Sequence, residues 1–241
     1  SMSDLQPSKL GTKEHWDSVY EEELANFEEI GDEGEIWHVN RSFGTESVEK
    51  MVEWALEHVP SSSNASILEV GSGNGTLLFG LLDAGYDPTT LSGIDYSRGA
   101  VSLAKEIANK RRGDASIISF SECDFLKDEP KVLESTQGEG EPGVWDVLMD
   151  KGTYDAIALS QKDENGKSPV EKYPGRVTRL LKPGGYFLIT SCNFTEDELK
   201  ASFATEETNL LYHSRIQHKT YTYGGKSGSI CSSVAFRKRL P

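Results

Sequence analysis

The stretch Glu69-Val70-Gly71-Ser72-Gly73-Asn74-Gly75 decides the fold of this chain. It follows a short apolar run at 67–70, which is typical of a buried strand, and it precedes a helical pattern at 76–84. Closely spaced glycines let the backbone turn tightly and approach a ligand. The helix that follows presents unpaired N–H groups to that ligand. A strand, a glycine-rich loop and a helix in this order predict a cofactor-binding turn, and the alternative is a chance glycine-rich turn.

Two classes of cofactor compete for this loop. A dinucleotide-binding loop has the order G-x-G-x-x-G, whereas the third position here is Thr76. An acid two residues before the first glycine, Glu69, would repel a pyrophosphate. It suits a cofactor that carries a cationic amino group and no phosphate, and S-adenosylmethionine (SAM) is such a cofactor. The loop therefore favours SAM and disfavours a nicotinamide cofactor.

The chain around this loop alternates between short apolar runs and helical patterns. We expect strands at 67–70, 91–95, 116–120, 144–150 and 186–191, and helices at 76–84, at 99–111 and in pieces up to 181. This alternation predicts a Rossmann-like α/β fold with a doubly wound, mostly parallel sheet. Two last runs, at 210–221 and 229–237, have no helix between them and predict an antiparallel hairpin that ends the sheet.

An N-terminal extension precedes the sheet. Residues 1–11 have little apolar content, and we expect a loose tail there. One helix is predicted from Thr12, whose hydroxyl suits an N-cap, to about Ile30, and another from about Thr45 to His58. The chain is therefore divided into a tail with a helical extension at 1–64 and one globular unit at 65–241. A long polar loop is expected at 127–143.

Acidic residues end or follow three more of the predicted strands, and in open parallel sheets ligands bind beyond the carboxyl ends of the strands. Asp95 ends the second strand, where a carboxylate can accept both ribose hydroxyls of the cofactor, while Ser97 is free to cap the next helix. After the third strand, Asp124 could accept from the adenine amino group and Phe125 could pack on the ring. Asp150 ends the fourth strand and is a candidate for contact with the methyl acceptor, with helix capping as its alternative role.

The composition and net charge limit the kinds of binding partner that the chain is expected to have. The 241 residues carry a net charge of −14 at pH 7, with 36% hydrophobic and 27% charged residues, as in soluble globular proteins. Such an acidic chain disfavours nucleic acid and anionic membranes, so we expect neither and favour a basic partner.

No apolar run reaches the ~18 residues of a membrane span, and we expect no leader peptide. Three scattered cysteines predict neither a zinc site nor a disulfide framework and indicate a reducing compartment.

Five blocks of the sequence carry a resemblance to a known family. They are Leu10-Gly11-Thr12-Lys13-Glu14-His15-Trp16-Asp17, Gly34-Glu35-Ile36-Trp37, Leu68-Glu69-Val70-Gly71-Ser72-Gly73-Asn74-Gly75, Asp150-Lys151-Gly152-Thr153-Tyr154-Asp155-Ala156 and Leu188-Ile189-Thr190-Ser191-Cys192-Asn193-Phe194-Thr195. Over roughly 65–237 the sequence resembles the class I, seven-strand SAM-dependent methyltransferases. Over nearly its whole length it is similar to the eukaryotic protein-lysine methyltransferases that modify translation elongation factor 1-alpha.

This resemblance implies which segment of the chain would contact each part of the cofactor. The glycine loop would border the methionine part, the end of the second strand the ribose, and the end of the third strand the adenine. Trp37 would help to close the site, Asp150 would face the lysine channel, and Tyr154 could line that channel as an aromatic residue. The cofactor-binding residues implied are Trp37, Glu69, Gly71, Ser72, Gly73, Asn74, Asp95, Tyr96, Asp124 and Phe125, and the catalytic ones are Asp150 and Tyr154.

The expected function is that of a cytoplasmic, monomeric protein-lysine N-methyltransferase that uses SAM and acts on elongation factor 1-alpha. The alternative is a SAM-dependent methyltransferase that acts on another protein or on a small metabolite, because helical extensions also cover small-molecule sites. A non-catalytic SAM-binding module is disfavoured, because Glu69, Asp95 and Asp150 are all present.

Overall fold

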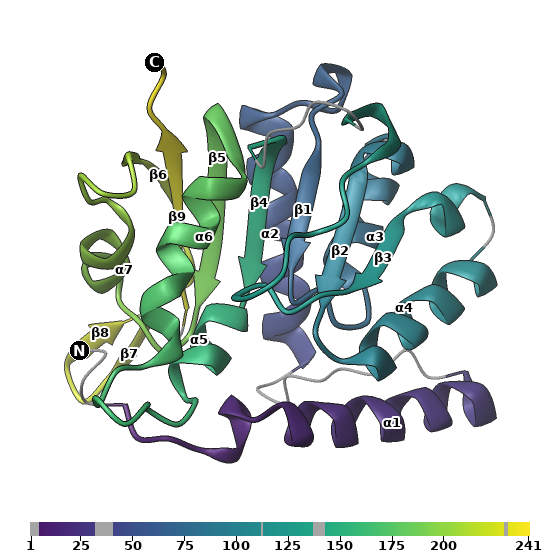
Figure 1. Ribbon diagram of the computed structural model, residues 1–241, viewed down its shortest axis with the longest axis horizontal. Coiled ribbons are helices and arrows are strands. Elements are labelled where there is room, and N and C mark those ends of the chain that lie inside the picture. The colour runs from purple at the N-terminus through teal and green to yellow at the C-terminus, as the bar shows by residue number, and fades with distance from the viewer. Residues whose placement is uncertain (1–4, 32–40, 112, 137–142, 229–230) are drawn as a thin grey trace.

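The computed structural model describes residues 5–31, 41–111, 113–136, 143–228 and 231–241. Over these ranges the chain forms a seven-stranded sheet in the order β3-β2-β1-β4-β5-β9-β6 and a separate two-stranded ribbon, β7-β8 (Figure 1). The strands are β1 (Ile67–Val70), β2 (Leu91–Asp95), β3 (Ser119–Glu122), β4 (Trp145–Lys151), β5 (Leu181–Ser191), β6 (Leu210–Ile216), β7 (Tyr221–Tyr223), β8 (Lys226–Gly228) and β9 (Ser232–Lys238). β1 to β5 pair in parallel, and β9 pairs antiparallel with β5 and β6. This confirms the predicted mostly parallel sheet with an antiparallel end.

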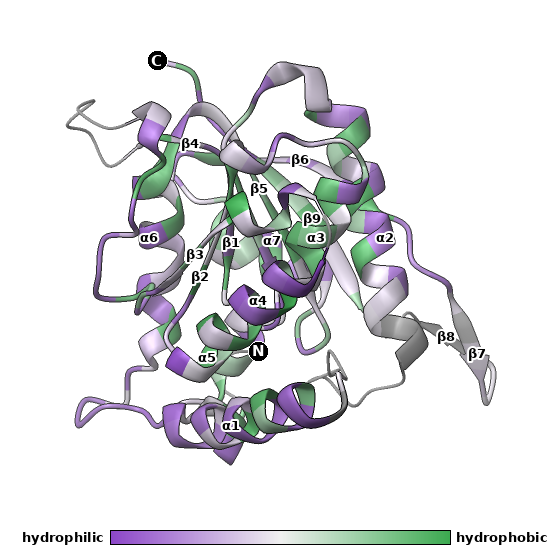
Figure 2. Cartoon of the chain, turned by 90° about the vertical axis from the view of Figure 1, so that its right-hand side faces the viewer, coloured by the Kyte–Doolittle hydropathy of each residue, from purple (hydrophilic) through white to green (hydrophobic). Residues whose placement is uncertain are grey.

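Helices cover both faces of the sheet, as a doubly wound fold requires. They are α1 (Lys13–Ile30), α2 (Arg41–His58), α3 (Thr76–Asp83), α4 (Arg98–Lys110), α5 (Thr153–Ala158), α6 (Tyr173–Leu180) and α7 (Glu196–Phe203). Figure 2 shows α5 and α6 on one side of the strands and α2 and α3 on the other. Because β1 to β5 run parallel, the segments that follow them all lie at the same end of the sheet, which is called its carboxyl edge below.

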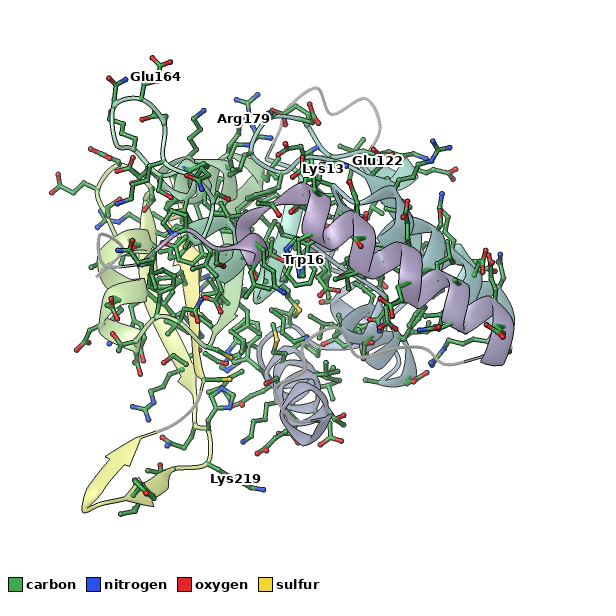
Figure 3. The ribbon with its side chains drawn as sticks, turned by 90° about the horizontal axis from the view of Figure 1, so that it is seen from below. Lys13, Trp16, Glu122, Glu164, Arg179 and Lys219 are labelled. Atoms are coloured by element: carbon green, nitrogen blue, oxygen red, sulfur yellow. The ribbon has the colours of Figure 1, made fainter. Side chains whose placement is uncertain are left out.

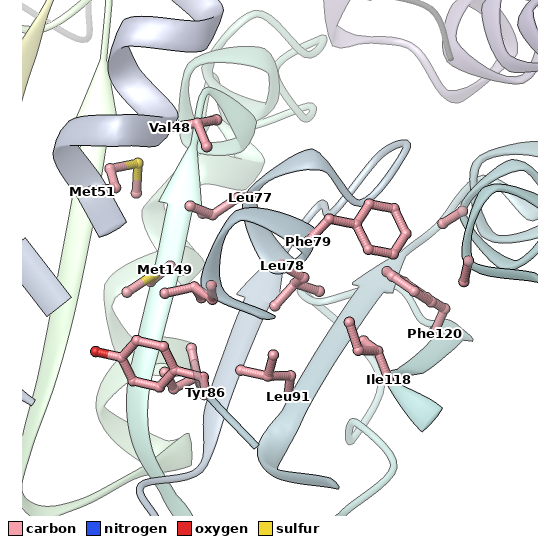
Figure 4. Close-up of a cluster of buried hydrophobic side chains, with 14 of the residues drawn as sticks. Val48, Met51, Leu77, Leu78, Phe79, Tyr86, Leu91, Ile118, Phe120 and Met149 are labelled. Atoms are coloured by element: carbon pink, nitrogen blue, oxygen red, sulfur yellow. The ribbon is translucent and has the colours of Figure 1, made fainter. Parts of the chain in front are cut away.

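Alternate residues of each strand feed two separate cores, because successive side chains of a strand point to opposite faces. Ile67 and Met149 belong to the core under α2, α3 and α4, which Figure 4 shows in part. Leu68 and Leu148 belong to the core under α6 and α7. The central strands are therefore apolar on both faces, and this explains their continuous apolar runs in the sequence.

Helix α1 lies across the carboxyl ends of the parallel strands (Figure 1). Its N-cap is Thr12, whose hydroxyl accepts from the His15 N–H, and it ends at Gly31 in the left-handed conformation. It packs closely on α4, since a Cβ on Gly99 would lie 3.1 Å from the Cβ of Tyr20. The helical extension therefore covers the edge at which ligands bind in such sheets.

The described part of the N-terminal segment is not the predicted loose tail. The Ser8 N–H donates to the Leu159 carbonyl at 3.0 Å, and the Ser160 hydroxyl donates to the Gly11 carbonyl at 2.9 Å. A Cβ on Gly11 would lie 2.2 Å from the Leu159 carbonyl, so only glycine allows this approach. The segment is held through its backbone N–H and carbonyl groups. Such contacts need no apolar side chains, so the sequence shows no pattern that would predict them.

Other boundaries differ from the prediction by a few residues. α2 begins at Arg41 rather than near 45, and β3 begins at Ser119 because a 3-10 turn occupies Asp114–Ile117. β6 ends at Ile216, and the β7-β8 ribbon, which was not predicted, follows it. α7 was also missing from the prediction. Its Thr195 N-cap and Glu198 form a reciprocal capping box.

Candidate active site

A cavity of about 370 Å³ lies at the carboxyl edge of the sheet, between the ends of β1 to β4 and α1. This is within the usual range of small-molecule and cofactor sites. Its lining residues come from six segments of the chain: Gly11, Lys13, Trp16, Tyr20, Val70, Gly71, Ile94, Asp95, Tyr96, Cys123, Asp124, Phe125, Leu126, Lys127, Lys151, Gly152, Thr153, Ala156, Ile157, Ser160 and Pro169. The sheet therefore brings together the segment after each of its first four strands.

The glycine loop forms one wall of this cavity. Gly71, Gly73 and Gly75 have φ values of 66°, 55° and 86°, a conformation that L side chains rarely adopt. A Cβ on Gly71 would lie 2.0 Å from Oγ1 of Thr153, because the loop lies directly against the start of α5. The three glycines are thus required by the backbone, and Gly71 is the loop glycine that lines the cavity.

Asp95 lines the cavity and holds the loop at the same time. One carboxylate oxygen accepts from the Gly73 N–H at 3.1 Å, and the other accepts from the Ser97 N–H at 2.9 Å. Burial raises the pKa of Asp95 to about 6. Each oxygen of an ionised carboxylate can accept further hydrogen bonds, so Asp95 retains capacity for two hydroxyl groups of a ligand. Ser97 caps α4, as predicted.

The end of β3 provides a second group of predicted residues. Asp124 is half-buried and accepts from the Leu126 N–H at 3.0 Å, and Phe125 is buried beside it. Tyr96 also lines the cavity, with the Lys13 ammonium 5.8 Å from its ring centroid. An apolar ring, a tyrosine and a carboxylate in one pocket match the needs of a purine base.

Helix α1 closes the cavity from the outside. Trp16 is buried and donates from Nε1 to the Leu10 carbonyl at 2.7 Å, and Tyr20 is buried one turn later. A Cβ on Gly73 would lie 2.7 Å from the Tyr20 hydroxyl oxygen, so Tyr20 reaches the glycine loop. Figure 3, which views the molecule from this edge, shows Lys13 and Trp16 at the start of α1. The extension is therefore a wall of the site.

Glu69 tests whether SAM fits this site. Its carboxyl is 3% exposed, and among the described residues its Oε1 has no hydrogen-bond partner. Burial raises its pKa well above the ordinary value, and the charge of Lys151 acts in the opposite direction. A buried, unpartnered acceptor beside the glycine loop fits a cationic amino group and opposes a phosphate. The residues present therefore fit SAM, with Asp95 for the ribose and Asp124 and Phe125 for the adenine.

Asp150 and Tyr154, predicted on the acceptor side, lie outside the cavity lining. The Asp150 carboxylate is fully buried and accepts from the Thr153 N–H at 2.7 Å, from the Tyr154 N–H at 2.8 Å and from the Tyr173 hydroxyl. The Tyr154 ring packs among buried aromatic side chains that include Phe203. The structure thus gives Asp150 the helix-capping role left open in the sequence. A catalytic role for either residue stays a prediction.

Four other predicted residues, Glu69, Ser72, Gly73 and Asn74, do not line the cavity. The Ser72 side chain packs over β2, since a Cβ on Gly93 would lie 2.6 Å from its Oγ. Asn74 accepts from the Thr76 N–H and hydroxyl, and Gly73 contacts Asp95 instead of the cavity. Trp37 lies outside the described residues. The predicted roles of these residues stay predictions.

The prediction missed the wall that α1 and the segment before it provide. Gly11, Lys13 and Trp16 belong to a block that carried the family resemblance, but they were not assigned to the site. Helical periodicity showed that Trp16 and Tyr20 face inward without showing what they cover. Lys151, Gly152 and Thr153 were also missed, although they follow directly after Asp150. In the part of the chain that the structure describes, no cluster of acidic, His and Cys side chains could hold a metal ion, and no helix has the length and apolarity to cross a bilayer.

The fold and the site define a class I, Rossmann-like SAM-dependent methyltransferase. A family model described as a methyltransferase domain matches residues 61–228. Protein-lysine N-methyltransferase efm4 of Schizosaccharomyces pombe is 39% identical over 98% of this chain and 97% of its own length. EEF1A lysine methyltransferase 2 of Homo sapiens is 39% identical over 96% of this chain and 88% of its own length. The chain belongs to this family of protein-lysine N-methyltransferases.

Solved structures show the fold alone, because their sequence identity is low. N-methyltransferase NodS from Bradyrhizobium japonicum, in complex with S-adenosyl-L-homocysteine, is 18% identical, with a TM-score of 0.60 over 92% of this chain and 98% of its own. The [4+2]-cyclase SpnF is 13% identical, with a TM-score of 0.64 over 98% of both chains. A methyltransferase and a cyclase share this architecture, so the chemistry is assigned from the site and the closer relatives.

Proposed function

We propose that this chain transfers a methyl group from SAM to a lysine side chain of translation elongation factor 1A. The observation that carries the proposal is the 39% identity, over nearly the full length, to proteins named as protein-lysine N-methyltransferase efm4 and EEF1A lysine methyltransferase 2. The identity covers α1 and the segment before it, which form a wall of the cavity, as well as the glycine loop. The support therefore extends beyond the cofactor site.

The chain's own part in such a reaction is mainly alignment. When bound, SAM supplies an electrophilic methyl group on a sulfonium. Asp95 and the glycine loop would hold the donor in one position, and Trp16 and Tyr20 would keep water from it. In-line displacement needs the acceptor nitrogen at close range in a fixed orientation, which is the largest advantage that such a site offers. The lysine must arrive neutral, because an ammonium has no lone pair, so its proton leaves before transfer.

The charge of the chain supports a basic partner. A net charge of −14 attracts a positively charged surface and raises the association rate, and salt weakens this effect. We further propose a cytoplasmic location, where a translation factor is found, a monomeric enzyme, and the division of the chain at residue 65. A membrane or a nucleic acid has no part in the proposed reaction.

The test is methyl transfer to a purified substrate. The chain is incubated with methyl-labelled SAM and purified elongation factor 1A, and the product is digested for peptide mass spectrometry. One methylated lysine is expected, with several-fold less label when the Asp95→Ala variant is used at a SAM concentration that saturates only the wild type. Confirmed SAM binding without any transfer would reject elongation factor 1A as the substrate while leaving the methyltransferase class intact.

A further inference from the structure

Two of the three cysteines meet at the carboxyl edge of the sheet, outside the cavity lining. Cys192 follows β5 directly, and Cys231 directly precedes β9. The two strands are antiparallel, with Ser191 opposite Ser232, so the next position outward on each strand places the cysteines opposite each other. Their Sγ atoms lie 2.9 Å apart. Cysteines 39 residues apart along the chain are thus brought into contact by the sheet.

This geometry suits a disulfide with little movement. Directly opposed residues of an antiparallel pair have Cα atoms about 4.5–5.5 Å apart, and disulfides span about 4.4–6.8 Å between Cα atoms. A disulfide has an S–S bond of about 2.04 Å, so the sulfur atoms need to approach by only about 0.9 Å. The hydrogen bonds between β5 and β9 hold both backbones in place, so a bond can form without rearrangement of the sheet.

The two thiols differ in access and in proton affinity. Cys192 is exposed, whereas Cys231 is buried. The hydrogen bond from the Cys192 thiol lowers the pKa of Cys231, and the same interaction raises the pKa of Cys192. One proton is therefore shared between the sulfur atoms after the first ionisation. The negative charge of Asp155 raises the pKa of both thiols, and the positive charge of Lys151 acts in the opposite direction. Such a pair has an exposed sulfur that can react and a second that can complete the exchange.

We propose that Cys192 and Cys231 form a redox-active dithiol that reacts with low-molecular-weight disulfides such as oxidised glutathione. Cys231 first loses its proton to water, and the Cys192 proton then passes to the Cys231 thiolate. The exposed Cys192 thiolate attacks one sulfur of the oxidant, and the glutathione thiolate that leaves takes up a proton from water. Cys231 then loses its proton and attacks the Cys192 sulfur, which releases the second glutathione thiol. Two protein S–H bonds are lost, one S–S bond forms, and the oxidant gains two electrons and two protons.

The third cysteine provides an internal control. Cys123 is buried, and burial raises its pKa to about 11. Its thiol donates to the Asp128 carbonyl at 3.9 Å. It has neither a neighbouring thiol among the described contacts nor an accessible thiolate, so oxidised glutathione should leave it unmodified.

The experiment treats the full chain with oxidised glutathione and maps the thiols by non-reducing peptide mass spectrometry. The wild type and Cys123→Ser should form one intramolecular Cys192–Cys231 disulfide, which dithiothreitol reverses. Cys231→Ser should stop at a glutathione adduct on Cys192, and Cys192→Ser should form neither product. Cys231→Ala replaces Cys231→Ser if the hydroxyl disturbs folding. A stable glutathione adduct on wild-type Cys192, disulfides between chains only, or no reaction would each overturn the proposal.

A thermal measurement gives a second, independent readout. The disulfide closes the loop that contains α7, β6 and the β7-β8 ribbon, and such a closure restricts the unfolded chain. The oxidised wild type should melt about 5 °C above the reduced protein. A lower melting temperature after oxidation would show that the native geometry does not accept the bond. Neither readout depends on methyl transfer, so the dithiol and the proposed function fail or succeed separately.

Discussion

The carboxyl ends of β2 and β4 look alike in the sequence and differ in the structure. A buried aspartate is the last residue of β2 and the next-to-last residue of β4, and a helix begins a few residues later. Asp95 lines the cavity and accepts one backbone N–H on each oxygen. Asp150 lies outside the lining and accepts from two backbone N–H groups and the Tyr173 hydroxyl. One carboxylate keeps capacity for a ligand, whereas the other is satisfied by the protein.

The difference lies in which residue caps the next helix. After β2, Ser97 caps α4 with its own hydroxyl, so Asp95 is left to the loop and the cavity. After β4, the N-cap position of α5 is Gly152, which has no side chain to cap the helix, and Asp150 takes that role. A carboxylate at a strand end is therefore a ligand candidate only where another residue satisfies the helix N-terminus.

The largest effect that we expect from this comparison is on stability. Asp150→Ala should lower the free energy of unfolding by about 3 kcal/mol, because it leaves three buried donors without an acceptor. Denaturant unfolding measures the loss. Tyr173→Phe removes only one of these donors and should cost about 1 kcal/mol. A stable Asp150→Ala protein that binds SAM without turnover would instead restore the catalytic role.

Asp95→Ala should mainly lower the affinity for SAM, with a smaller effect on the stability of the fold. Loss of a charged acceptor for two ribose hydroxyls is expected to reduce SAM affinity by about 30-fold, or about 2 kcal/mol. Isothermal calorimetry measures the affinity. The exposed Asp87, which caps the turn before β2, provides a matched control, since Asp87→Ala should bind SAM as the wild type does. Unchanged affinity in Asp95→Ala would remove Asp95 from the ribose site.

The pH dependence of stability also distinguishes Asp150. Burial raises its pKa to about 7, against about 3.9 for an unfolded aspartate. The folded state therefore binds this proton more tightly, and stability falls as the pH rises through the interval between the two values. Between pH 5 and 7, the wild type should lose about 1 kcal/mol more per pH unit than Asp150→Asn, which cannot titrate. Parallel unfolding profiles would show that Asp150 does not titrate in this range.

The smallest effect concerns the wall that α1 adds to the donor side. Trp16→Phe removes the hydrogen bond to the Leu10 carbonyl and part of the cavity lining, so SAM affinity should fall about threefold. Glu22→Ala, at an exposed position of α1, serves as the control. Equal affinities in the two variants, measured by calorimetry, would show that the indole does not support the donor.

The sequence was sufficient for the parts of the molecule that local patterns specify. Short apolar runs located β1 and β2, and a period-3.6 pattern located α4, to within a residue. The glycines predicted the loop because positive φ angles leave few alternatives. Asp95 was predictable because Ser97 offered a cap for α4 two residues later. The sequence thus located five predicted cofactor-binding residues that line the cavity, Gly71, Asp95, Tyr96, Asp124 and Phe125, and their roles stay predictions.

The rest depends on contacts that are distant in sequence. Gly11 is fixed by the Leu159 backbone, and the role of Asp150 depends on Tyr173, 23 residues away. Hydrophobic periodicity in the sequence does not predict a contact between two backbone segments, nor a hydrogen bond from a hydroxyl on another helix. The meeting of Cys192 and Cys231 depends in the same way on the β5–β9 register. Long-range register, rather than local propensity, decides these functional details.

The place of β9 in the sheet has a consequence for biosynthesis. β9 lies between β5 and β6, although β6 precedes it along the chain, and within the described structure β6 pairs with β9 only. On the ribosome, β3-β2-β1-β4-β5 can assemble while the residues after β5 are still being added, but β6 must wait for β9. Until then the edge of β5 is open, and an open edge is where partly made sheets pair wrongly. Completion of the sheet thus waits for the synthesis of β9.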